Sequence, residues 1–128
     1  MDIILYAMPD SSSAQVLEDT LQKTFFPIVL KRFDTLQRFI QYAVEHRGKE
    51  QIIIMVIERL REFLDLHSLF NHDNLENLII ICDDSEDMIK LAHEFRPRFL
   101  AHENELDKVV AVVEKMMQVA KSTAGKLL

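Results

Sequence analysis

The chain has 128 residues, of which 48% are hydrophobic and 28% are charged, the balance expected of one soluble globular domain. Its net charge of −6 argues against non-specific nucleic-acid binding, which depends on clustered lysine and arginine. No apolar run approaches the roughly 20 residues of a membrane-spanning helix, and the start lacks a basic signal-peptide region, so we expect no membrane association and a cytoplasmic location. The single cysteine excludes an intrachain disulfide, and two glycines are too few for a Walker A loop or a GxGxxG fingerprint.

The first half of the chain contains two strand–helix units. An uninterrupted apolar run at residues 3–8 predicts a buried strand, and the serines at 11–13 then supply hydroxyls that cap a helix. A short run at 28–30, interrupted at once by Lys31 and Arg32, predicts an edge strand. We expect Asp34 to cap the second helix and Gly48 to end it. The apolar stripes of the two helices are predicted at Ala14, Leu17, Leu21 and Phe25, and at Leu36, Phe39, Ile40, Ala43 and Val44.

The second half contains three more units. The runs at 52–57 and 78–82 are uninterrupted and predict buried strands, whereas the short run at 99–101 predicts a second edge strand. A polar connection is expected at 71–74. The expected caps are Asp84 or Ser85 for the fourth helix, and Asn104 with Asp107 for the fifth. The stripes are predicted at Leu60, Phe63, Leu64 and His67, at Met88, Ile89, Ala92 and Phe95, and at Leu106, Val109, Val110, Val113 and Met117.

Helical segments between consecutive strands predict a parallel sheet with crossover connections. The three long runs belong in the centre of that sheet and the two short ones at its edges. We therefore predict one α/β domain over residues 1–121, a flavodoxin-like three-layer sandwich with five parallel strands in the order 2-1-3-4-5, and a frayed C-terminal tail at 122–128. In this order a ligand site is expected at the carboxyl ends of strands 1 and 3, where the winding reverses.

The residues at the carboxyl ends of the predicted strands are unusual for such a site. One acid, Asp10, follows the first strand, and the third strand ends at Ile57 and Glu58. The fourth ends at Cys82 and Asp83, and His102 follows the fifth. In element order, lengths and size, residues 2–120 resemble the receiver domain of two-component response regulators, which carries paired acids, an acceptor aspartate, Ser/Thr and Lys-Pro at these places. The resemblance implies a degenerate, or pseudo-, receiver.

These substitutions predict a protein that is not an enzyme and has no metal or cofactor. Asp10 and Glu58 are a poor pair of ligands for Mg²⁺, and no lysine directly follows the fifth strand to compensate the charge of an acyl phosphate. Glu58 is either a permanent mimic of a phosphorylated aspartate or, as we favour, a first-turn acid stabilised by the helix dipole. We interpret Cys82 as a core thiol, His67 as a core histidine and the acids from Asp83 onward as helix caps. The serines at 11–13 are interpreted as caps, with an anion site as the alternative.

The last predicted helix carries a second apolar stripe at Val112, Met116 and Val119. A helix that covers one sheet face needs only about a 100° apolar arc, so the second stripe indicates a partner site or burial beneath another segment. Active receivers commonly dimerise or dock partners through the face of helix 4, strand 5 and helix 5. The resemblance thus implies a protein partner or a homodimer on this face, and a non-catalytic interaction module in intracellular signalling or regulation. The alternative is a small-molecule or phosphate-binding flavodoxin-like module.

Overall fold

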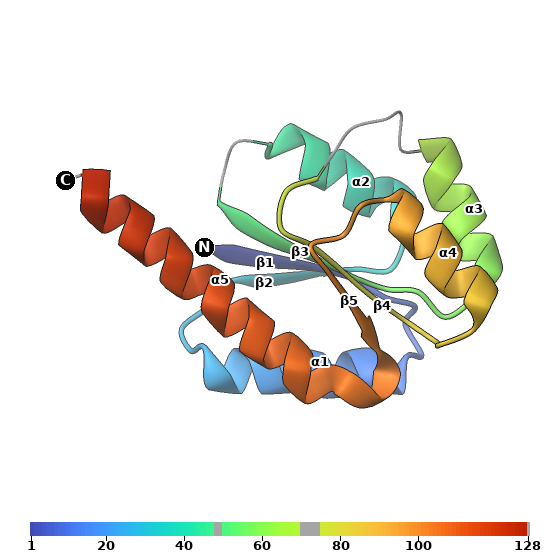
Figure 1. The fold of residues 1–128 in the computed structure, drawn as a ribbon, viewed down its shortest axis with the longest axis horizontal. Coiled ribbons are helices and arrows are strands. Elements are labelled where there is room, and N and C mark those ends of the chain that lie inside the picture. Colours follow the sequence, from blue (N-terminus) through green and yellow to red (C-terminus); the bar gives the residue numbers. More distant parts are fainter. Residues whose placement is uncertain (48–49, 70–74, 128) are drawn as a thin grey trace.

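Five parallel strands form one sheet at the centre of the molecule, in the order β2-β1-β3-β4-β5 (Figure 1). The computed structural model describes residues 1–47, 50–69 and 75–127, with side chains to residue 120. The predicted strand order is therefore confirmed. The central strands are β1 (Asp2–Tyr6), β3 (Gln51–Val56) and β4 (Leu78–Cys82), and the edge strands are β2 (Leu30–Phe33) and β5 (Phe99–His102).

Helices cover both faces of the sheet and complete the three layers (Figure 1). Residues of alternating strand positions fall into two separate apolar clusters, one under each helical layer, because successive strand side chains point to opposite faces. Both faces are buried, which explains why the central strands are continuous apolar runs. One layer consists of α2 (Leu36–Glu45), α3 (Leu60–Leu69) and α4 (Glu86–Glu94), and the other of α1 (Ser12–Thr24) and α5 (Leu106–Leu127).

The edge strand β2 lies further along the chain than predicted. The prediction placed it at 28–30, before Lys31 and Arg32, but both charged residues lie within the strand. An edge strand tolerates them because one of its sides has no neighbouring strand. The guanidinium of Arg32 donates to the Glu18 carboxylate at 3.1 Å and to the Met8 carbonyl at 3.0 Å, so its charge is compensated.

The buried face of α3 differs from the prediction. Phe63 and Leu66 are buried, whereas Leu60 and Leu64 are 44% and 56% exposed. Each residue turns a helix by about 100°, so a ten-residue apolar pattern allows a face that is rotated by one position. The prediction that His67 is a core histidine is wrong: its exposed ring lies 3.9 Å from the Glu94 carboxylate.

Two of the predicted helix caps are confirmed and two are wrong. Ser11 and Ser85 accept hydrogen bonds from the backbone N–H groups three residues on, at the starts of α1 and α4. Thr35, and not Asp34, is the residue before α2, since the helix begins at Leu36. A short 3-10 turn at Glu103–Glu105 precedes α5 and moves its capping box from Asn104 and Asp107 to His102 and Glu105. The predictions for Gly48 and for 71–74 lie outside the described residues.

The core stripe of α5 includes a residue that the sequence analysis placed on the second stripe. Met116 is only 5% exposed and packs in the same cluster as Val109 and Val113, whose spacing it continues. The backbone of this helix runs to Leu127, and fraying of the segment 122–128 stays a prediction. Its C-terminal end projects beyond the sheet (Figure 1).

Candidate functional site

The carboxyl ends of the strands bring some of the predicted site residues together and leave others apart. Glu58 is half-buried after β3, and Asp10 is exposed after β1. Within the described residues, neither side chain makes a hydrogen bond or an ion pair. His102 faces Asp84, with 3.7 Å between Nε2 and Oδ1. No three histidine, cysteine or acidic side chains in the described part of the chain lie close enough to share a metal ion.

The principal carboxylate at this edge is one that the sequence analysis missed. Glu62, in the first turn of α3, is only 7% exposed. Its Oε1 accepts the backbone N–H groups of Glu58 and Arg59, at 2.9 and 3.0 Å. Its Oε2 accepts the hydroxyl of Tyr6, the last residue of β1, at 2.6 Å. The carboxylate therefore ties the end of β1 to the start of α3.

Glu62 occupies the position at which this helix would bind an anion. The N-terminus of a helix carries unpaired N–H groups and a partial positive charge, and here the chain's own carboxylate receives both. Burial, followed by the hydrogen bond to Glu62 and its negative charge, raises the pKa of the Tyr6 hydroxyl well above its usual range. Tyr6 consequently remains a hydrogen-bond donor at neutral pH.

The residues at the end of β4 pack in the core or bind the backbone at the start of α4. Cys82 is buried, and burial, with smaller effects from Asp83 and Glu103, raises the pKa of its thiol from 9.0 to about 11. Because the thiolate is the reactive form, this thiol is a weak nucleophile at neutral pH. The backbone N–H of Ser85 donates to Asp83 at 3.0 Å and holds the pKa of that carboxyl below its usual range.

His102 forms a cap at the end of β5. Its ring Nδ1 accepts the backbone N–H of Asn104 at 3.2 Å, and the backbone N–H of His102 donates to Glu105 Oε1 at 2.9 Å. Lys108 donates to Glu105 Oε2 at 2.7 Å and, with the His102 N–H, holds the pKa of that carboxyl below its usual range. These bonds fix the connection from β5 to α5.

A cavity of about 530 Å³ opens beside the buried carboxylate, between α2 and α3. Tyr6 and Glu62 line it together with Arg59, Arg61 and Asp65. The two guanidinium groups make no hydrogen bond or ion pair within the described residues. The two arginines and the two acids that line this cavity therefore leave it with no net charge.

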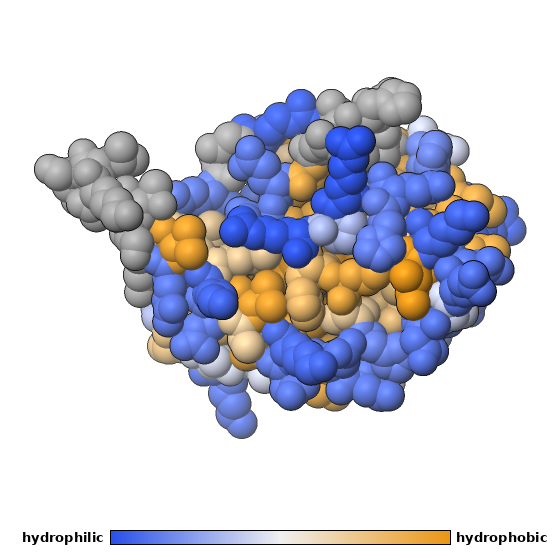
Figure 2. All heavy atoms as spheres, viewed as in Figure 1, coloured by the Kyte–Doolittle hydropathy of each residue, from blue (hydrophilic) through white to orange (hydrophobic). Residues whose placement is uncertain are grey.

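A different feature distinguishes the side of the molecule formed by α4, β5 and α5. Figure 2 shows a band of hydrophobic residues that crosses β5 and the adjoining surfaces of the two helices, surrounded by hydrophilic residues. The half-buried apolar side chains here include Leu91, Phe99, Leu100 and Val112. Of the predicted partner stripe, Val112 is half-buried and Val119 is 53% exposed, whereas Met116 belongs to the core.

Comparison of the chain with protein families finds no matching family, and comparison with curated proteins finds no matching protein. The resemblance to receivers therefore rests on element order, element lengths and size, and the residues at the strand ends depart from the receiver pattern. Among the described residues, the helices, including the 22-residue α5, are each too short or too polar to cross a membrane.

Proposed function

We propose that the chain is a non-catalytic, receiver-like module that binds another protein through the face of α4, β5 and α5, in intracellular signalling or regulation. The observation that carries the proposal is the hydrophobic band over β5 (Figure 2). An edge strand with one unpaired side, flanked by apolar helix surfaces, is the kind of surface that protein interfaces cover.

The carboxyl edge of the sheet supports a role without phosphotransfer. At the end of β3, where receivers carry the acceptor aspartate, Ile57 is fully buried, and the Glu58 side chain makes no hydrogen bond or ion pair within the described residues. The first turn of α3 already holds the Glu62 carboxylate, which would repel an incoming phosphoryl group.

Incubation with acetyl phosphate and Mg²⁺ is therefore expected to leave the intact mass unchanged. A receiver that retains its acceptor aspartate, treated in parallel, is the positive control. An added phosphoryl group that maps to Glu58 or Asp10 would contradict the non-catalytic role.

The partner-binding role is tested by placing a photo-crosslinking residue on the proposed face. Benzoylphenylalanine at Val112 is expected to give a discrete covalent complex, either with a second copy or with one other protein. The same residue at the exposed Gln41 on α2, in the opposite helical layer, is expected to give none. Mass spectrometry identifies the cross-linked chain, and multi-angle light scattering of the purified protein decides between a homodimer and a heteromeric complex.

A charged substitution then shows whether that contact is required. Val112→Lys is expected to weaken the complex at least tenfold while leaving the melting temperature within a few degrees, because Val112 is only half-buried. Equal cross-linking at Val112 and Gln41, or loss of the fold in Val112→Lys, would remove the support for this face.

A further inference from the structure

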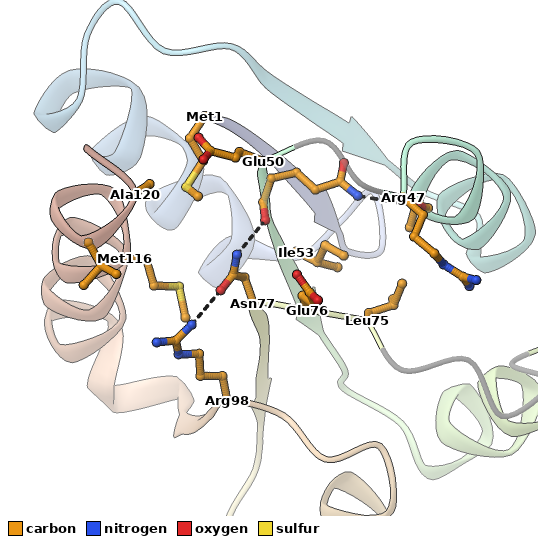
Figure 3. A pocket seen from close by; sticks show the side chains of 13 residues that line it. Met1, Arg47, Glu50, Ile53, Leu75, Glu76, Asn77, Arg98, Met116 and Ala120 are labelled. Atoms are coloured by element: carbon orange, nitrogen blue, oxygen red, sulfur yellow. Dashed lines mark hydrogen bonds between the residues drawn. The ribbon is translucent and has the colours of Figure 1, made fainter. Parts of the chain in front are cut away.

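A second cavity lies at the amino ends of the strands, whereas Glu62 lies at their carboxyl ends. It has a volume of about 430 Å³, within the range of small-molecule sites. Residues from the starts of β3 and β4 form its centre, and α2 and α5 lie on either side (Figure 3). Met116 and Val119, which the sequence analysis assigned to the partner stripe, line this cavity, and the receiver resemblance gives it no role.

A chain of hydrogen bonds builds the polar wall of the cavity. Arg98 Nη1 donates to Asn77 Oδ1 at 2.8 Å, and Asn77 Nδ2 donates to the Gln51 carbonyl at 3.3 Å (Figure 3). The buried Gln51 side chain in turn donates to the Ala43 carbonyl at 3.4 Å. Asn77 adopts a left-handed backbone conformation, with φ of 56°, which aims its amide between the two neighbours.

These hydrogen bonds position the guanidinium of Arg98, which has no acidic partner among the described residues. Arg98 binds the neutral amide of Asn77 and makes no ion pair within the described residues. Its backbone N–H is also fixed, since it donates to the Leu78 carbonyl at 2.8 Å. Figure 3 shows the side chain reaching from the start of β5 toward α5. A guanidinium held in this way presents its remaining donors in the planar arrangement that matches a carboxylate.

The remaining wall is largely apolar. Ile53 and Leu75 line the side near α2, and Met116 and Val119 line the side formed by α5. Methionine is an adaptable side chain that fits an irregular aliphatic ligand. Arg47, Glu50 and Glu76 also line the cavity. The two carboxylates balance the charges of Arg47 and Arg98, which favours a ligand with no more than one negative charge.

We propose that this cavity binds a monoanionic amphiphile, whose carboxylate pairs with Arg98 and whose short aliphatic tail lies against Ile53, Leu75, Met116 and Val119. The guanidinium recognises the head group, and the apolar wall recognises the tail. We expect both parts to contribute to binding, the head group by charge and the tail by apolar burial.

Octanoate is the probe, with n-octanol and acetate as matched controls that lack the charge and the tail. Titration of ¹⁵N-labelled protein with octanoate is expected to give saturable amide shifts at Ile53, Asn77 and Val119 and none at Glu62. n-Octanol cannot form the charge-assisted hydrogen bonds with Arg98, and acetate buries no aliphatic tail, so each control is expected to bind at least tenfold more weakly.

Three variants test the role of Arg98. Arg98→Gln is expected to weaken octanoate binding at least tenfold, whereas Arg38→Gln, at an exposed position outside the cavity, leaves it unchanged. Asn77→Gly keeps the left-handed backbone and the Arg98 charge but removes the amide that positions it, and is expected to weaken binding less than Arg98→Gln. The proposal is overturned if octanoate gives no saturable shifts in the millimolar range, if n-octanol binds as well as octanoate, or if Arg98→Gln binds like the parent.

Discussion

Replacing Glu62 with alanine is expected to lower the free energy of unfolding by about 3 kcal/mol, the cost of leaving buried hydrogen-bond donors without a charged acceptor. The carboxylate accepts two backbone N–H groups and the Tyr6 hydroxyl, and the alanine methyl replaces none of these bonds. Glu62→Gln retains one acceptor oxygen and is expected to lose less. Urea denaturation followed by circular dichroism measures both variants.

Glu58→Ala is the matched control for this prediction. Glu58 lies four residues earlier, and its side chain makes no hydrogen bond or ion pair within the described residues, so we expect a change below about 0.5 kcal/mol. Tyr6→Phe combined with Glu62→Gln should be less destabilising than the sum of the two single changes, because both remove the same contact. A loss in Glu58→Ala as large as that in Glu62→Ala would contradict the assignment of Glu62 as the structural acid at this edge.

The order of the sheet could be predicted from the sequence because burial on two faces leaves a local signature. Strands β3 and β4 have helices over both faces, so every residue in them is buried. This burial produces a continuous apolar run that can be recognised in the sequence without knowing which strands are neighbours. The rotation of α3 has no such signature. Both Leu64 and Leu66 are apolar, and only packing against neighbouring elements leaves the first exposed and buries the second.

The Glu62 site could be predicted only in part. A glutamate at the third position of a helix commonly reaches back to the N–H of the residue before the helix, and that signal was present in the sequence. Its burial was not predictable, because it depends on a bond to Tyr6, 56 residues away, at the end of another strand. The Arg98–Asn77–Gln51 chain was hidden for the same reason, since its members come from three different strand starts.

Truncation of an apolar side chain is expected to cost more stability in a central strand than in an edge strand. Ile54→Ala in β3 is expected to cost about 4 kcal/mol, because Ile54 is fully buried and has Leu5 and Ile79 as its strand neighbours. Leu100→Ala in β5 removes a side chain of similar size that is only half-buried, and is expected to cost about half as much. Urea denaturation compares the two variants.

The order of the two effects should reverse when partner binding is measured: Leu100→Ala should weaken binding, whereas Ile54→Ala should not. Leu100 lies on the edge strand within the hydrophobic band, so its truncation is expected to weaken the non-covalent complex with the partner identified by cross-linking at least tenfold, although the monomer stays folded. Ile54→Ala, assayed at a temperature at which it remains folded, should bind as the parent does, because Ile54 has no exposed surface. Equal stability losses would contradict the assignment of β5 as a half-covered edge. Unchanged binding in Leu100→Ala would mean that the apolar surface of β5 is not what the partner contacts.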